Sequence, residues 1–541
     1  MRKNDVYSGR DYKERLLSGI EKVAKSVTST LGAKGRTVII EKDFQTPHIT
    51  KDGVTVAKAI NLKDPIENIG ARLITQASEH TNKEAGDGTT TSTLLAYGII
   101  KEAQKYIASG ADANAIRRGM EKTLGYIVDT IKGDSTKIEN REDVFNIAMV
   151  SSNGDKEISD IVADCFMKVG ASGIVSVDNA TYNETTLEIQ EGYSVDRGYM
   201  SHHFANNADK TECVLEDSYV FVLEGSFELN AVAPILDQVS RSAKPLVMFV
   251  DTLPPEILKV FVENKLNGAI TVNLVQNDGI GQEKVDIRED IATLTGTQVY
   301  SQRAGHKLQD LKLVNLGRAK KVVSQRESTK IFIHDSVPTE KINERVALIQ
   351  EFINTTNNVA EKKKAEKRVA KIKDGIAVIY VGAHTDTELK EKKDRVDDCV
   401  SAVRASLQEG VVIGGGVELL KVSRDIKYTH IDMSGDEELG KKILQDVLRM
   451  PFLKIMENGG KNGEVCASQV DLHSYHGVFD IRENKLVLLD HGCNIFDPTK
   501  VVRLAVINAV YTAGVIITSE YCIGMEEQKM DPSMFGGLDL G

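Results

Sequence analysis

The stretch Gly86-Asp87-Gly88-Thr89-Thr90-Thr91 is the most informative part of the sequence, because it places flexible backbone, one carboxylate and three hydroxyls directly before an apolar helical segment at 92–100. Glycines let backbone N–H groups turn toward an anion, and a helix N-terminus favours negative charge. A carboxylate there is suited to holding a divalent cation against phosphates. The alternative is an ordinary glycine-rich turn in which Asp and Thr cap the helix, and a lone Gly-Asp-Gly-Thr is about as typical of that. The three consecutive threonines favour a phosphate site.

A second turn-rich region lies upstream, in Thr30-Leu31-Gly32-Ala33-Lys34-Gly35-Arg36 and in Thr50-Lys51-Asp52-Gly53-Val54. Strand-like and helix-like apolar stretches flank the second of these turns, as expected for a loop that presents polar side chains from a rigid scaffold. The region therefore supplies another carboxylate and a lysine that can balance phosphate charge, although a solvated turn lysine is an equally ordinary interpretation.

Two downstream motifs complete the pattern. Asp397 and Asp398 are adjacent in a helical pattern, so only one of them can point into a site. Gly414-Gly415-Gly416 permits close approach of the backbone to a ligand, but on its own it is also typical of a loop that enters a helix.

Together, and in this order and spacing, these motifs resemble the nucleotide site of the group I chaperonins, the GroEL-like ATP-driven folding machines. The resemblance extends over about residues 6–520, and the chain is a somewhat divergent example. It implies a multidomain α and α/β fold: a mostly helical equatorial domain from 1–135 and 411–541, a small intermediate domain from 136–191 and 376–410, and an α/β apical domain from 192–375. It also implies rings of seven subunits, single or stacked in pairs.

The resemblance further implies that ATP and Mg²⁺ bind here, with K⁺ as an additional candidate. Asp87 matches the metal ligand, and Asp398 matches the residue that activates water for attack on the γ-phosphate. Asp52 is assigned to catalysis as well, although it could support the same water or help to hold the metal. The nucleotide-binding positions implied in this sequence are Thr30, Leu31, Gly32, Lys51, Gly53, Gly88, Thr89, Thr90, Thr91, Ser151, Gly414, Gly415, Asp480 and Asp497.

The chain departs from the family pattern near the base pocket. Asp480 stands where the family often has an asparagine after an aromatic residue, and the segment 490–500 carries about two extra residues before its Asp-Pro-Thr-Lys. We expect the nucleotide site to survive with an altered rim.

For binding of unfolded polypeptides, matching by segment to the family's apical helices selects Tyr199, Phe204, Leu236, Leu258 and Val262. On composition alone each would be an ordinary core residue. The same surface departs from the family at Ala233, Glu263 and His203, the loop 276–282 lacks the family's basic signature, and the tail 530–541 has a single Gly-Gly pair. These departures leave the use of a small lid co-chaperonin open.

The texture of the sequence agrees with an inserted middle region. Residues 11–134 and those beyond 410 are rich in helical apolar patterns, whereas 192–375 alternates strand-like and helical segments, so the two ends should fold together. Gly192 and Gly375 are candidate hinges. We expect the charged run 361–368 to be a solvated helix face and the apolar stretch 501–518 to be a core or subunit-interface helix.

Composition excludes several functions. A chain of 541 residues with a formal charge of −11 is too long for one core and too acidic for a nucleic-acid binder. Its six cysteines show no CxxC spacing, which argues against a zinc site or a disulfide framework. No export signal, presequence or membrane span is indicated, so we expect a cytoplasmic protein.

Three functions remain open. The first is an ATP-dependent chaperone that binds non-native polypeptides and folds them in a ring cavity. The second is a metabolic phosphotransferase with the same phosphate cradle, although no catalytic His or Cys constellation supports it. The third is a degenerate holdase or assembly subunit with little ATP turnover, and retention of Asp52, Asp87 and Asp398 argues against it.

Overall fold

The computed structural model describes residues 4–41, 47–138, 140–152, 154–170, 173–180, 182–207, 210–356, 358–373, 375–472, 477–488 and 494–525. The tail 530–541 lies outside these ranges, as does part of the segment 490–500 in which about two extra residues are predicted. The chain divides into two compact units. One comprises 1–164, 181–184 and 381–541, and the other comprises 165–180 and 185–380. Both chain ends therefore belong to one unit and the middle of the chain to the other.

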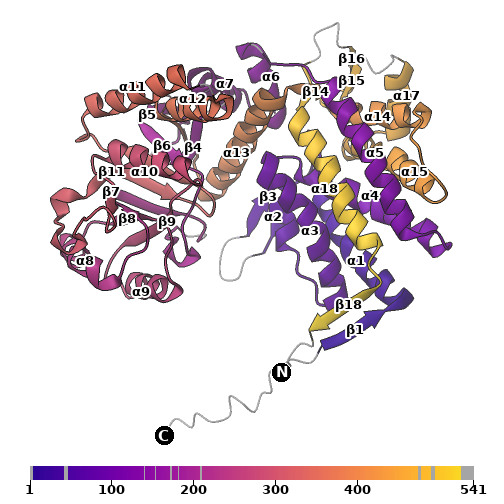
Figure 1. Ribbon diagram of the computed structural model, residues 1–541. Coiled ribbons are helices and arrows are strands. Elements are labelled where there is room, and N and C mark those ends of the chain that lie inside the picture. Colours follow the sequence, from indigo (N-terminus) through magenta and orange to yellow (C-terminus); the bar gives the residue numbers. More distant parts are fainter. Residues whose placement is uncertain are drawn as a thin grey trace. The chain divides into compact units, whose positions relative to one another are not determined.

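The first unit is mainly helical (Figure 1). Its amino-terminal elements are β1 (Asn4–Ser8), α1 (Gly9–Thr28), β2 (Val38–Ile40), β3 (His48–Thr50), α2 (Gly53–Ala59), α3 (Pro65–Ala85), α4 (Thr89–Ala108), α5 (Ala113–Gly133), α6 (Arg141–Ser151) and α7 (Lys156–Val169), whose end belongs to the second unit. Its carboxy-terminal elements are α13 (Asp386–Glu409), β14 (Val411–Ile413), α14 (Val417–Tyr428), α15 (Glu437–Val447), α16 (Met450–Asn458), α17 (Gly463–Leu472), β15 (Gly477–Asp480), β16 (Lys485–Leu488), β17 (Phe496–Pro498), α18 (Thr499–Ile517) and β18 (Tyr521–Met525).

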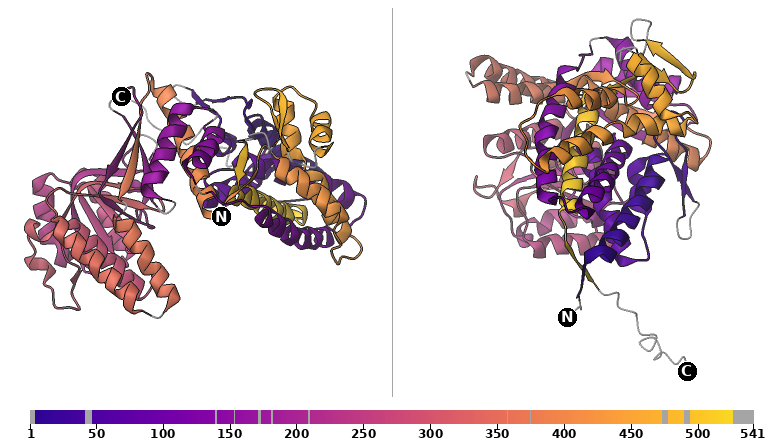
Figure 2. Two further views of the ribbon diagram at one scale, coloured as in Figure 1. Left: turned by 90° about the horizontal axis from the view of Figure 1, so that it is seen from above. Right: turned by 90° about the vertical axis from the view of Figure 1, so that its right-hand side faces the viewer.

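Helix α18 lies at the centre of this unit, against α3, α4 and α5 (Figure 2). By length and composition α18 could cross a membrane, but 56% of its apolar window is buried inside the fold. Its apolar side chains share one core with those of α1, α3, α4 and α5. The stretch 501–518 is therefore part of a packed core helix, as the polar residues within it predict.

The second unit is α/β. Its elements are β4 (Ile174–Asn179), β5 (Thr186–Gln190), β6 (Gly192–Val195), η1 (His202–Phe204), β7 (Cys213–Glu224), α8 (Leu229–Ser242), β8 (Leu246–Val250), α9 (Pro255–Leu266), β9 (Val272–Gln276), α10 (Gln282–Thr295), β10 (Tyr300–Ser301), η2 (Leu308–Asp310), η3 (Leu313–Asn315), β11 (Gly317–Ser324), β12 (Thr329–Ile333), α11 (Thr339–Thr355), α12 (Val359–Lys373) and β13 (Ile376–Val381). The main sheet runs in the order β6-β12-β11-β7-β8-β9, and β7, β8 and β9 are parallel because α8 and α9 connect them.

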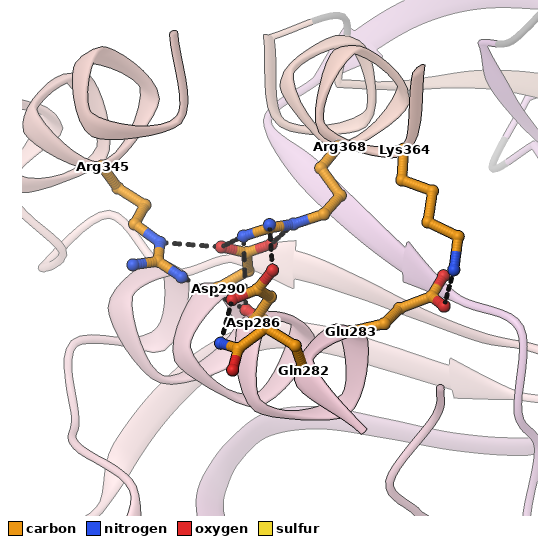
Figure 3. A network of polar contacts seen from close by, with 7 residues as sticks. All are labelled: Gln282, Glu283, Asp286, Asp290, Arg345, Lys364 and Arg368. Carbon is orange, nitrogen blue, oxygen red and sulfur yellow. Dashed lines mark hydrogen bonds and ion pairs between the residues drawn. The ribbon is translucent and has the colours of Figure 1, made fainter. Parts of the chain in front are cut away.

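A buried ion network attaches α11 and α12 to α10 (Figure 3). Asp290 is fully buried and accepts from Arg345 Nε at 2.8 Å and from Arg368 Nε at 2.7 Å. Arg368 also reaches Asp286 at 2.8 Å. The prediction of a solvated face at 361–368 is therefore wrong at Arg368, which is almost buried, and at Ala365, which is 2% exposed. Ala365, Arg368 and Ile372 follow one another at helical spacing, so all three face the core.

The predicted fold class, helical from the two ends and α/β in the middle, is confirmed. The bounds of the equatorial, intermediate and apical domains stay a prediction.

Candidate functional site

The loop before α4 is built as a cradle for an anion. Gly88 is the N-cap of α4 in a left-handed conformation, and no side chain caps the helix, so the first N–H groups of Thr89, Thr90 and Thr91 remain available to a ligand. The Asp87 carboxylate accepts from the Gly88 N–H at 2.5 Å, which fixes the side chain beside the cradle. The loop in which the sequence predicts a phosphate site is therefore followed, in the structure, by an uncapped helix N-terminus.

Helix α2 lies beside the same cradle. Asp52 caps α2 by accepting from the backbone N–H groups of Val54 at 3.2 Å and Thr55 at 2.8 Å, and from the Thr55 hydroxyl at 2.6 Å. A Cβ placed on Gly53 would lie 2.4 Å from Thr90 Oγ1, so α2 and α4 meet closely here. Asp52 is therefore held rigidly, although much of its hydrogen-bonding capacity is already used by the cap.

Helix α13 brings Asp398 to the cradle from a distant part of the chain. A Cβ on Gly86 would lie 2.5 Å from Ser401 Oγ, so α13 contacts the loop that precedes the cradle. Burial raises the pKa of Asp398 well above its ordinary range, and the negative charges of Asp87 and Asp52 raise it further. Of the two adjacent carboxylates, Asp398 thus faces the other acids.

The acids of this site oppose one another's ionisation. Burial raises the pKa of Asp87, and the charge of Asp52 adds to that effect. Burial raises the pKa of Asp497 to about 7, with a contribution from Asp87, while the N–H groups of Gly416 and Gly415 partly stabilise its ionised form. Asp394, one turn before Asp398 on α13, has its pKa raised to about 7 by burial and then by Asp52. Such a cluster calls for positive charge, which a bound cation would supply.

A cavity of about 340 Å³ joins these elements. The predicted nucleotide residues that line it are Thr30, Leu31, Gly32, Lys51, Asp87, Gly88, Thr90, Thr91, Ser151, Asp398, Gly415, Asp480 and Asp497. Four other predicted residues do not line the cavity: Asp52, Thr89 and Gly414, which adjoin cavity residues in sequence, and Gly53, which follows Asp52. Thr89 is buried in the first turn of α4, and Gly414 packs against the backbone of Phe496 and Asp497.

Sequence reasoning missed several cavity residues. Glu418, in the first turn of α14, is 3% exposed, and burial together with the charge of Asp134 raises its pKa to about 8. Arg482, in the turn between β15 and β16, also lines the cavity. Asp480, a predicted nucleotide residue that lines the cavity, also holds this turn, because its Oδ1 accepts from the backbone N–H groups of Arg482 and Glu483.

The residues predicted to bind polypeptides lie in the second unit. Leu236, Leu258 and Val262 are half-buried on α8 and α9, and Tyr199 packs beside them on the same core. Phe204 is completely buried, so as the structure stands it has no surface to offer to a polypeptide. Its ring anchors the short helix η1 to the core instead. In α9 only Phe261 is fully buried, which leaves the other apolar side chains of this described helix partly accessible.

Comparisons with known proteins agree with this architecture. The model of the TCP-1/cpn60 chaperonin family matches residues 23–527. A crystal structure of the chaperonin gp146 of bacteriophage EL (Pseudomonas aeruginosa), determined in the presence of ATP-BeFx, superimposes with a TM-score of 0.70 at 20% identity. The match covers 96% of this chain and 99% of that one. A second crystal form of gp146 gives a TM-score of 0.64 at 19% identity over the same shares.

The family match spans nearly the whole sequence, and the fold match extends over both units. This chain therefore belongs to the TCP-1/cpn60 chaperonin family, and its function is that of an ATP-dependent molecular chaperone.

Proposed function

We propose that the chain is a group I-like chaperonin subunit that hydrolyses ATP in the 340 Å³ cavity and uses the hydrolysis cycle to fold bound polypeptides. The single observation that carries this proposal is the convergence of Asp87, Asp398 and the uncapped N-terminus of α4 on one cavity. It is supported by the phage chaperonin of the same fold, which was crystallised with an ATP analogue.

The residues fit a magnesium ion. Within the described residues, no group of three or more His, Cys, Asp or Glu side chains is arranged to hold a metal by itself. Mg²⁺ typically takes one or two carboxylates and completes its shell with water and substrate phosphates. Asp87 would hold it from one side, and Asp398 stands close enough for their charges to interact. When bound, Mg²⁺ would neutralise phosphate charge.

Each side chain then has a defined task. The N–H groups at the start of α4 and the threonine hydroxyls bind the phosphates, and Lys51 balances their charge. Asp398 orients water in line with the γ-phosphate and accepts its proton, a contribution typically worth about 10²–10⁴ in rate. Asp52 supports that water through its charge while capping α2.

The closing step is assigned to α13. Because Asp398 lies on α13 and Asp87 lies in the loop before α4, a bound nucleotide and cation would contact both of these elements. Moving a two-state equilibrium from 1:99 to 99:1 requires a differential affinity of about 5.5 kcal/mol. A charged ligand held between two elements can supply that differential affinity. Hydrolysis of the ligand then removes it.

We assign client binding to the half-exposed apolar residues of α8 and α9, in homo-oligomeric rings of seven. Each such side chain would contribute at most about 1.5–3 kcal/mol on burial against a client. Several weak contacts around a ring give avidity without sequence specificity. We place the protein in a reducing cytoplasm, since no disulfide forms among the cysteines of the described residues. A small lid co-chaperonin is a further candidate partner.

Phosphate release measured with purified wild type and two variants tests the proposal. We expect Asp398→Ala to bind ATP with near-normal affinity and to lose turnover by at least about 100-fold. Asp87→Ala should lose Mg²⁺-dependent binding and turnover together. Wild-type hydrolysis rates in Asp398→Ala would refute the assignment. Absent turnover in the wild type itself would favour a holdase without ATPase activity, and size-exclusion chromatography with light scattering would show whether rings form.

A further inference from the structure

The turn between β15 and β16 is built to present one arginine. β15 pairs with β16 from Gly477 with Leu488 to Asp480 with Lys485, leaving residues 481–484 as the turn. Asp480 Oδ1 accepts from the Arg482 N–H at 2.8 Å and from the Glu483 N–H at 3.3 Å, which fixes the backbone where the arginine emerges. Arg482 and its neighbour Ile481 both line the nucleotide cavity.

The guanidinium of Arg482 reaches the segment that follows α6. A Cβ placed on Gly154 would lie 3.0 Å from Arg482 Nη1 and 3.5 Å from Cζ. Gly154 has a left-handed φ of +89°, so it is suited to this position both by its backbone and by the lack of a side chain. The arginine therefore spans from the β15–β16 hairpin to the backbone at Gly154, and both ends belong to the same compact unit.

Arg482 is an exposed residue of this turn. No ion pair found among the described residues involves its guanidinium, whereas Arg395 and Arg503 of the same unit each bind a carboxylate. Among the described residues that line the cavity, only Lys51 and Arg482 are basic. Lys51 precedes the α2 cap beside the phosphate cradle, whereas Arg482 belongs to the β15–β16 hairpin.

Apolar side chains line the cavity next to this hairpin. Ile455 and Ile495 line it beside Val478, and these side chains pack on the small core around α16, α17 and β15. A planar heterocycle fits between aliphatic side chains and a guanidinium plane, because the guanidinium stacks on π faces and is weakly hydrated. Phosphate groups fit this part of the cavity poorly, since the N–H groups that would donate to them lie at the start of α4.

We infer that Arg482 is a specificity-determining residue that closes over the purine base of the bound nucleotide. The inference rests on the proposed function, because it requires a nucleotide in this cavity. Asp480 then acts as a positioning residue for Arg482 and does not itself contact the base.

Isothermal titration of the full-length assembly with ATP, ADP and inorganic tripolyphosphate tests the inference. In Arg482→Ala we expect the Kd of ATP and that of ADP to rise by the same factor, about tenfold, while the Kd of tripolyphosphate stays unchanged. Arg482→Lys should weaken ATP and ADP by at least about threefold, because an ammonium keeps the charge but lacks the plane.

The matched control is Lys485→Ala, which removes a cation of the same hairpin that pairs with Glu483 and does not line the nucleotide cavity. It should leave all three affinities unchanged. Unchanged ATP affinity in Arg482→Ala overturns the inference, as does a loss that grows from ADP to ATP together with weaker tripolyphosphate binding. An equal loss in Lys485→Ala overturns it too. A wild type that binds no nucleotide would instead refute the proposed function itself.

Discussion

Replacing Asp290 by asparagine should release α11 and α12 from the second unit. Asp290 is fully buried and accepts three hydrogen bonds from two arginines, at 2.8, 2.7 and 2.8 Å. The amide keeps the shape of the carboxylate but removes its charge and turns one acceptor into a donor that faces a guanidinium. Two nearly buried guanidinium groups then lose their main counter-charge (Figure 3).

The expected magnitude follows from that geometry. Removing one partner of a buried ion pair typically costs about 3–5 kcal/mol, because the remaining charge stays buried without compensation. Asp286 still binds Arg368 at 2.8 Å and shares part of the charge, so we take the lower end, about 3 kcal/mol. This corresponds to roughly a 150-fold increase in the opening equilibrium of the two helices.

Hydrogen exchange resolved by peptide is the appropriate measurement, since a chain of several units does not unfold in one step. Amides of α11 and α12 should exchange roughly 150-fold faster in Asp290→Asn, and those of α4 and α18 should be unchanged. The control is Lys364→Ala, which breaks an exposed pair with Glu283 on the same face and should alter exchange by less than about fivefold. Equal exchange in Asp290→Asn and wild type, or equal effects of the two variants, would refute the reasoning.

Three further predictions concern the first unit. Because burial raises the pKa of Glu418 from 4.5 to about 8, the folded protein keeps a proton that the unfolded chain releases in this window, and stability falls as pH rises through it. Glu418→Gln should remove up to about 1.4 kcal/mol of that loss per pH unit, measured as the difference from wild type in peptide-resolved hydrogen exchange of α14 from pH 5 to 9. Gly86→Ala would place a Cβ 2.5 Å from Ser401 Oγ at a φ of +72°, so phosphate release should fall at least about tenfold, and Ser401→Gly in the same chain should restore part of it. Asn458→Ala removes hydrogen bonds to the carbonyls of Thr28 at 3.0 Å and Leu31 at 2.9 Å, so the Kd of ATP should rise about tenfold by calorimetry with little change in turnover, and an unchanged Kd would exclude this anchoring role.

The proposed phosphate end of the site could be recognised from local sequence because its chemistry is local. Gly88, Thr89 and the threonines after it would act through backbone N–H groups of consecutive residues, and the three consecutive threonines favour this interpretation over a capped turn. Asp398 could not be found in this way. It reaches the cradle only because α13 packs against Gly86, and the sequence near Asp398 reads equally well as an exposed acidic helix. The family resemblance supplied that residue.

Long polar side chains account for the rest of what the sequence could not predict. Arg368 belongs to a lysine-rich run that is typical of a solvated face, and its burial depends on Asp290, which lies on α10, a separate helix. Arg482 likewise follows an aspartate that matches a family nucleotide contact, although in this fold that aspartate holds the turn. At Arg368 the informative contact is to a carboxylate on another helix, whereas Asp480 binds the backbone N–H groups that follow it in its own turn. We therefore infer the ligand contact of Arg482 from its place at the cavity, where no described carboxylate pairs with it, and not from the family motif.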